Sequence, residues 1–367
     1  MRAIEGHFAR TAAVLSRPVP ALDGVRGIAI LLVLFHHFGY KYTVHNRVQL
    51  LLHRSFELGW CGVDLFFVLS GFLITGILLD TRRAANYFQS FYARRVLRIF
   101  PAFFLFLGGT SLIVRLPHAA MYWTYLANWI PYSQQYPPLY HLWSLSIEEQ
   151  FYFVWPLLVF WLAPRQLGRA AILIAAAAVV IRSDVHGWLR YEATPARLDG
   201  FAISALAAVA LRDEEWHAWA VRLWRPALAL GAAGFFWALW RAHEATPHSA
   251  AMGGIGLSCI AIAGTGLLVG TVTEGFLARP LEARWLRTYG KYSYAIYLFH
   301  FPLSVWLEQT GAVQGFVADH GLLYVIAAAG GSLLLGIASW RLFEARFNAY
   351  KSRFAARHDT DAAVAPA

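Results

Sequence analysis

The stretch GVRGIAILLVLFHHFGY, residues 24–40, decides the fold class of this chain. It is apolar over nearly the length of a membrane-spanning helix, which needs about 20 residues. Three ionisable side chains lie within it, Arg26 near one end and His36 and His37 near the other. An ionisable group inside the hydrocarbon of a bilayer is costly, so each of these residues is a functional candidate.

The spacing of these residues separates the two histidines. Arg26 and His37 are eleven residues apart, which on an α-helix is about three turns plus about 20°. They therefore share one helix face and lie about 16 Å apart along the axis. His36 points about 100° away from His37. We therefore predict that Arg26 and His37 are functional and that His36 is a structural neighbour.

The composition of the whole chain is that of a membrane protein. Of 367 residues, 58% are hydrophobic and only 14% are charged, and the mean hydropathy is +0.47. Soluble domains carry about 25% charged residues. Residues 1–20 contain arginines and prolines but no apolar core, so we expect no cleavable signal peptide. The two cysteines have neither disulfide-framework nor metal-ligand spacing, and no metal is predicted.

Hydrophobic runs predict an all-α polytopic membrane protein with about ten transmembrane helices. The predicted domain division is a cytoplasmic N-terminal segment (1–20), a transmembrane domain (21–347) and a cytoplasmic C-terminal tail (348–367). The segment 119–138 is broken by prolines and is predicted to be a loop or a partial helix at the interface. The predicted spans lie near 24–42, 59–80, 99–116, 140–163, 170–184, 197–212, 225–242, 252–273, 289–308 and 321–343.

Lysine and arginine predict the orientation of these spans. With a cytoplasmic N-terminus and ten spans, most of the 31 Lys and Arg residues fall on the cytoplasmic flanks, as the positive-inside rule requires. Both termini are then cytoplasmic. The net charge of +10 is explained by a basic surface that faces anionic membrane lipid, so no nucleic-acid partner is predicted.

This topology places several polar side chains in the outer half of the membrane. His37, Asp64, Glu148, Glu149 and His300 all fall at that depth. A histidine held by a carboxylate is the arrangement of a general base. Simpler explanations remain open for the others: the aspartate can cap its helix, the glutamates can mark the outer end of a span, and the second histidine can be a packing residue.

A second polar cluster lies at the cytoplasmic side. The sequence FYARRVLRIFP, residues 91–101, places Arg94, Arg95 and Arg98 at the start of the third span. Arg95 and Arg98 are three residues apart and face the same way on a helix. Arginine binds phosphate through paired hydrogen bonds. With Arg26 nearby these side chains form a predicted anion site, although a positive-inside flank explains them as well.

Five blocks of the sequence, in chain order, are LDGVRGIAILLVLFHH (22–37), GVDLFFVLSGFLIT (62–75), FYARRVLRIFPAF (91–103), LWSLSIEEQFYFVWP (142–156) and YGKYSYAIYLFHFPL (289–303). Together they resemble the acyltransferase-3 family of integral-membrane acyltransferases, over about residues 20–347. Members of this family modify bacterial polysaccharides, lipopolysaccharide and some small molecules.

The resemblance implies roles for several residues. The family pattern of an arginine, ten residues and a catalytic histidine falls on Arg26 and His37. Its Arg-x-x-Arg pattern, implicated in handling the acyl-CoA donor, falls on Arg95 and Arg98, and the acid of its Ser-Leu-x-x-Glu block falls on Glu148. The fused SGNH esterase-like domain of some members is not expected here.

The expected function is therefore O-acylation in the bacterial inner membrane. An acetyl group of cytoplasmic acetyl-CoA would move to a hydroxyl of a cell-surface or exported glycan, or of a lipid-linked saccharide. His37 would act as general base or acyl carrier, and Asp64 or Glu148 would orient it or hold the sugar. The alternatives are a transporter or flippase for a lipid-linked glycan, a sensor or scaffold, and acylation of a small molecule such as a macrolide.

Overall fold

The computed structural model describes residues 2–39, 44, 46–244 and 246–357, which form helices and no strand. The all-α fold class is therefore confirmed. Six helical stretches within this part of the chain are long and apolar enough to cross a membrane, whereas the count of ten and the cytoplasmic termini stay predictions. The six stretches are Pro20–Gly39, Arg47–Thr81, Tyr87–Ile113, Pro164–Asp184, Met252–Thr273 and His320–Phe354.

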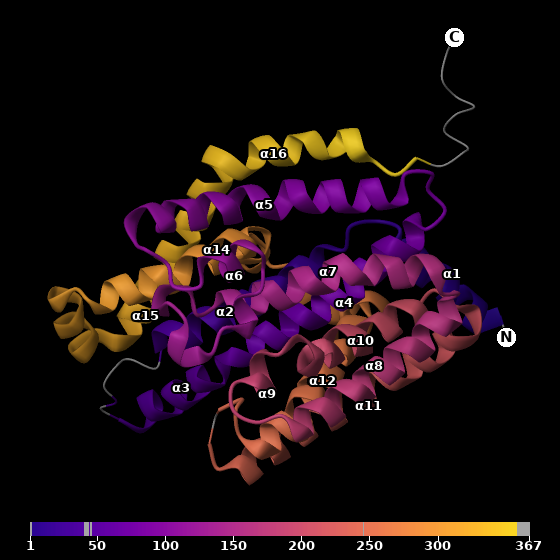
Figure 1. Cartoon of the computed structure of the whole chain (residues 1–367). Coiled ribbons are helices and arrows are strands. Elements are labelled where there is room, and N and C mark those ends of the chain that lie inside the picture. The colour runs from indigo at the N-terminus through magenta and orange to yellow at the C-terminus, as the bar shows by residue number, and fades with distance from the viewer. Residues whose placement is uncertain (1, 40–43, 45, 245, 358–367) are drawn as a thin grey trace.

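Ten long helices nevertheless overlap the ten predicted segments (Figure 1). The largest difference is at α5, which begins at Tyr87 rather than near residue 99, because the turns that carry its arginines are helical although they are not apolar. The ten are α2 (Pro20–Gly39), α4 (Cys61–Thr81), α5 (Tyr87–Ile113), α7 (Leu142–Trp161), α8 (Pro164–Asp184), α10 (Thr194–Ala210), α11 (Glu214–Ala242), α12 (Leu257–Thr273), α14 (Arg284–Glu308) and α15 (Gly311–Ser339).

Short elements connect and flank these helices. Two π-helical turns, η5 (Met252–Gly256) and η6 (Trp340–Glu344), adjoin α12 and α15. The short helices are α1 (Arg2–Leu15), α3 (Arg47–Glu57), α6 (Ala119–Trp123), α9 (Leu189–Glu192), α13 (Gly275–Leu281) and α16 (Ala345–Ala349), and the 3-10 turns are η1 (Leu58–Trp60), η2 (Ala127–Trp129), η3 (Tyr132–Gln134), η4 (Pro137–Leu139) and η7 (Tyr350–Phe354).

The proline-broken segment 119–138 forms α6 and three 3-10 turns, as the sequence predicts. The Gln135 amide donates a hydrogen bond of 2.9 Å to the Glu192 carboxylate and so ties this segment to α9. Burial raises the pKa of Glu192 to about 7, although the hydrogen bond from Gln135 acts in the opposite direction. The connection is therefore packed onto the helices rather than extended away from them.

The chain after α15 returns along α5, where α16 lies beside it (Figure 1). Asn86 at the start of α5 donates to the Ala355 carbonyl at 2.9 Å and accepts from the Arg357 amide at 2.9 Å. The first part of the predicted tail 348–367 is thus bound to the helical domain. Residues 358–367 of that tail, and residues 40–42 of the first predicted span, lie outside the described residues.

Helices α2 and α14 approach each other closely through glycine. A Cβ atom on Gly290 would lie 1.8 Å from the Asp23 carbonyl oxygen, and one on Gly27 would lie 2.1 Å from the Leu286 carbonyl oxygen. Only glycine lets the two backbones come this close. The contact fixes the register of two helices that run in the same direction, so that His37 and His300, ten residues further along each helix, lie opposite each other.

Candidate functional site

A cavity of about 350 Å³ lies between α2, α4, α5, α7 and α14. It brings together four of the six predicted site residues, three arginines from two different helices and one glutamate. Tyrosine and serine side chains complete its polar wall. The polar residues that line it include Asp23, Arg26, Ser70, Arg95, Arg98, Ser144, Glu148, Glu149, Tyr152, Tyr294 and Tyr297.

The arginines give this cavity a positively charged side. Arg26 on α2 pairs with Asp23 at 2.7 Å. The Arg95 guanidinium on α5 lies 3.9 Å from the centre of the Tyr152 ring, and its Nε is buried with no hydrogen-bond partner. Arg98, one turn further along α5, lines the same cavity, whereas Arg94 is exposed. A cluster with an unpaired buried donor fits an anionic group.

Glu148 on α7 lines the same cavity and is held in place by two hydroxyl groups. Its carboxylate accepts hydrogen bonds from the hydroxyls of Ser70 on α4 and Tyr152 on α7. These two hydroxyls also lie 2.9 Å from each other. The three side chains form a compact hydrogen-bonded group beside Arg95, so the orientation of the carboxylate is set by α4 and α7 together.

His37 lies beside the cavity and contacts a second histidine. Nδ1 of His37 is 3.0 Å from Nε2 of His300 on α14, and the ring of Phe301 packs edge-on against His37 with 4.7 Å between centroids. Nδ1 of His300 is 2.7 Å from the Tyr297 carbonyl oxygen. The Tyr297 side chain lines the cavity and its ring lies 5.3 Å from that of His300. Tyr297 thus connects the cavity lined by Arg26, Arg95 and Arg98, the arginine cavity, with the histidine pair of His37 and His300.

Neither predicted carboxylate forms a hydrogen bond with His37. Asp64 instead pairs with Arg197 of α10 at 2.5 Å, and both side chains are buried. The second Asp64 oxygen, and Nε and Nη1 of Arg197, are buried without a hydrogen-bond partner. Glu148 is bound to its serine and tyrosine. His36 lines a different pocket, together with residues of α3 and α11.

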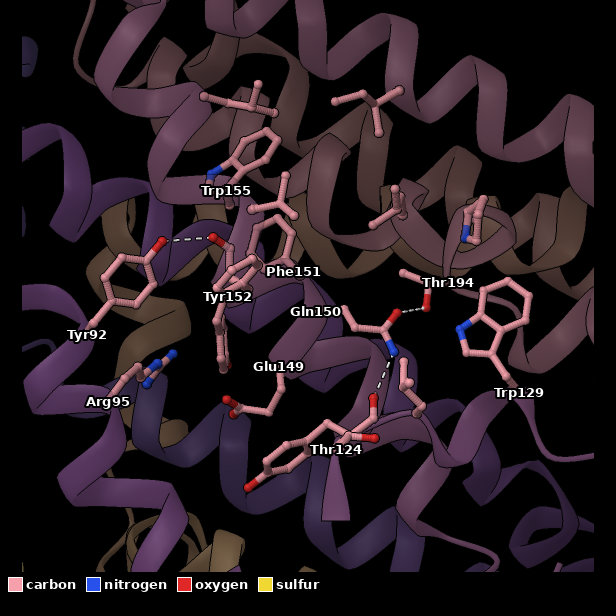
Figure 2. Close-up of a pocket in the computed structure, with 18 of the residues that line it drawn as sticks. Tyr92, Arg95, Thr124, Trp129, Glu149, Gln150, Phe151, Tyr152, Trp155 and Thr194 are labelled. Atoms are coloured by element: carbon pink, nitrogen blue, oxygen red, sulfur yellow. Dashed lines mark hydrogen bonds between the residues drawn. The ribbon is translucent and has the colours of Figure 1, made fainter. Parts of the chain in front are cut away.

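A second, mostly apolar cavity of about 710 Å³ lies on the other side of Arg95 (Figure 2). It shares Arg95, Tyr125, Glu149 and Tyr152 with the arginine cavity. Figure 2 shows the Glu149 carboxylate turned toward Arg95. Gln150, further along the wall, is satisfied by Thr194, whose hydroxyl donates to it at 2.5 Å. Arg95, Glu149 and Tyr152 therefore form a polar wall between the two cavities.

Sequence reasoning gave Ser70 and Tyr152 no role in the site, and it left the role of His300 open between function and packing. For His300 the signal was its depth, which matches that of His37 in the opposite helix, but its aromatic neighbours in YSYAIYLFHFP suggested packing. Ser70 and Tyr152 carry no signal of their own, because each becomes polar support only through contact with Glu148. Within the described part of the chain, no group of three or more His, Cys, Asp or Glu residues is arranged to hold a metal ion.

Comparison with known proteins places the chain in a family. A family model described as "Acyltransferase domain" matches residues 19–341. Peptidoglycan O-acetyltransferase OatA of Listeria monocytogenes is 32% identical over 174 residues, 41% of this chain and 26% of OatA. YrhL of Bacillus subtilis, named as an inferred peptidoglycan O-acetyltransferase, is 35% identical over 162 residues, 38% of this chain and 24% of YrhL.

The matches cover about a quarter of the length of these relatives. No solved structure matches the chain. The family match, in contrast, contains all ten long helices in full, and it includes every residue of the arginine cavity except Pro18. The chain therefore belongs to this family of membrane acyltransferase domains, the acyltransferase-3 family that its sequence blocks resemble.

Proposed function

We propose that this protein transfers an acetyl group from cytoplasmic acetyl-CoA to a hydroxyl of a glycan, with His37 as the base. The observation that carries the proposal is the joining of an arginine cluster, through Tyr297, to a histidine pair of which His300 is buried. Acetyl-CoA has an anionic, phosphate-bearing end and a reactive thioester end, so its donor site needs a cationic part and a catalytic part. The names of the relatives support O-acetylation and a glycan acceptor.

The donor would bind with its phosphates at Arg26, Arg95 and Arg98. Each guanidinium can form paired hydrogen bonds with phosphate oxygens. The unpaired Nε of Arg95 supports this assignment, because a buried donor without a partner is costly unless a ligand satisfies it. The pantetheine arm would then extend along the cavity toward Tyr297 and the histidines.

The transfer step forms an ester bond to the acceptor and breaks the thioester bond of the donor. His37 would accept the proton of the acceptor hydroxyl while the hydroxyl oxygen attacks the acetyl carbonyl carbon. The carbon–sulfur bond of the thioester breaks, and the departing thiolate of CoA takes the proton from His37. Glu148, held by Ser70 and Tyr152, would orient the sugar through its carboxylate. Asp64 would act at a distance, by holding Arg197 and α10 against α4.

The experiment that tests this function measures acetyl transfer by the purified protein in lipid nanodiscs. Radiolabelled acetyl-CoA and a glycan acceptor are supplied, and free CoA thiol and acetylated glycan are counted. We expect His37→Ala to lower kcat by about 10²- to 10⁴-fold, the usual contribution of a general base. Arg95→Ala should raise the KM for acetyl-CoA by about 10-fold or more, since a hydrogen bond to a charged group contributes about 1.5–3 kcal/mol.

The chain contains a matched control for each variant. His36→Ala removes the neighbouring histidine that lines another pocket, and Arg94→Ala removes the exposed arginine next to Arg95; both should leave kcat and KM near the wild-type values. Full activity of His37→Ala would contradict the proposed base. Movement of glycan into sealed proteoliposomes without any release of CoA would instead identify a transporter.

A further inference from the structure

The hydrogen-bond partners of the His37–His300 pair determine which ring nitrogens carry protons. His300 is completely buried, and both of its ring nitrogens have hydrogen-bond partners. Nδ1 faces the Tyr297 carbonyl oxygen at 2.7 Å, and Nε2 faces Nδ1 of His37 at 3.0 Å. A carbonyl oxygen can only accept a hydrogen bond. Nδ1 of His300 must therefore carry a proton.

The protonation of the second nitrogen of His300, Nε2, then follows from the net charge of the ring. The ring packs against the rings of Tyr297, His141 and Phe301, and among the described residues no carboxylate forms a hydrogen bond with it to stabilise a cation. A neutral imidazole carries a single proton, so Nε2 of His300 is an acceptor. Nδ1 of His37 must donate to it, which leaves the lone pair of His37 on Nε2.

We propose that His300 is the positioning residue of the acyl-transfer site: by accepting from Nδ1–H of His37, it fixes the tautomer and ring orientation in which Nε2 of His37 is the base. This inference rests on the proposed function and extends it. In serine-protease triads a buried aspartate performs the same task for the catalytic histidine. Here a neutral imidazole, anchored to the Tyr297 backbone, replaces the carboxylate.

The positions of the two acidic candidates support this assignment. Asp64 is paired with Arg197, and Glu148 accepts from Ser70 and Tyr152, so each carboxylate is already bound to a different partner. The glycine contact between α2 and α14 also fits a positioning role, because it sets the two histidines at hydrogen-bond distance through the backbone. Rigid helices, rather than loops, hold both rings.

Three substitutions at position 300 separate this role from simple packing. His300→Gln places an amide oxygen near the position of Nε2 and can still accept from His37. His300→Asn is shorter and can satisfy only the Tyr297 carbonyl, and His300→Leu fills the space without polar atoms. A misplaced reacting group can cost about 10²-fold in rate. We expect His300→Leu and His300→Asn to lower kcat by about 10²-fold with an unchanged KM for acetyl-CoA, and His300→Gln to recover most of that loss.

A spectroscopic measurement tests the hydrogen bond without any turnover. Solid-state NMR of ¹⁵N-histidine-labelled protein in nanodiscs distinguishes the protonated ring nitrogen, and His37→Ala and His300→Gln spectra assign the two signals. We expect wild-type His37 to be protonated at Nδ1 and to lose this preference in His300→Leu. Protonation of wild-type His37 at Nε2, or equal loss of kcat in the Gln and Leu variants, would overturn the inference. If the His37→Ala variant kept full acetyl transfer while His37 of the wild-type protein was protonated at Nδ1, the proposed function would be rejected but the hydrogen bond to His300 would stand.

Discussion

Asp64 and Asp80 lie near opposite ends of α4, and each is paired with an arginine from the α10 region. Asp64 and Arg197 are 2.5 Å apart with side-chain exposures of 7% and 1%, whereas Asp80 and Arg212 are 2.7 Å apart with exposures of 48% and 19%. Removing one partner of a buried ion pair leaves an uncompensated charge, at a cost of about 3–5 kcal/mol. An exposed pair contributes about 1 kcal/mol or less.

Asp64→Asn should therefore lower the free energy of unfolding far more than Asp80→Asn. Thermal unfolding of both variants in the same detergent, followed by size-exclusion chromatography of heated samples, measures the difference. The double variant Asp64→Asn/Arg197→Met should recover much of the loss, because it removes the unpaired charge as well. Equal shifts of the unfolding temperature in the two single variants would show that the buried pair has no special role in stability.

At the scale of single residues, the sequence predicts site residues where the depth of a polar side chain in an apolar run is a sufficient signal. Arg26, His37, Arg95 and Arg98 could be selected because a charged or titratable group in an apolar run is unusual wherever its partners lie. Asp64 was found by the same signal, but its partner Arg197 lies 133 residues away along the chain. Partner choice is a property of helix packing, and so the expected contact of Asp64 with the histidine could not be checked from sequence.

At the scale of the helices, the packing of α2 on α14 decides whether the histidine pair can form. Gly290→Ala would place a methyl carbon 1.8 Å from the Asp23 carbonyl oxygen, so the helices would have to separate. We expect a less stable protein in which acetyl transfer falls together with the His37–His300 hydrogen bond. Gly109→Ala on α5, where no atom lies within 4 Å of the added carbon, is the control and should be neutral or stabilising by up to about 1 kcal/mol.

Unfolding temperature, transfer rate and the ¹⁵N signal of His37 check this prediction together. Wild-type values of all three for Gly290→Ala would contradict the close backbone contact.

The helices themselves were predictable from the sequence, because hydrophobic runs of this length are rarely anything else. The start of α5 was not, since the turns from Tyr87 to Arg98 are amphipathic and contain arginines. The glycine contact between α2 and α14 was not predictable either, because a glycine in an apolar run has no signal that distinguishes a helix crossing from a lipid-facing position.

At the scale of the whole molecule, the topology depends on how many of the ten long helices cross the membrane. Six stretches satisfy length and apolarity, and the helices α7, α10, α11 and α14 do not, although α7, α10 and α14 contain the buried residues of the site or its supporting ion pairs. Polar residues that face the interior of a bundle lower the apolarity of a spanning helix without excluding it from the membrane. We therefore retain the ten-span prediction with both termini in the cytoplasm.

Four exposed connections distinguish ten spans from six. Arg83 precedes α5, Glu244 follows α11, Glu282 precedes α14 and Gln309 follows α14, and all four side chains are exposed. In a Cys61→Ser/Cys259→Ser background, each is replaced singly by cysteine and intact cells are treated with a membrane-impermeant thiol reagent. Ten spans with a cytoplasmic N-terminus predict labelling of Glu244→Cys and Gln309→Cys, and of Arg83→Cys and Glu282→Cys only after lysis. If only the six apolar stretches crossed, Glu244→Cys would be protected and Glu282→Cys would be labelled, so these two positions alone decide between the topologies.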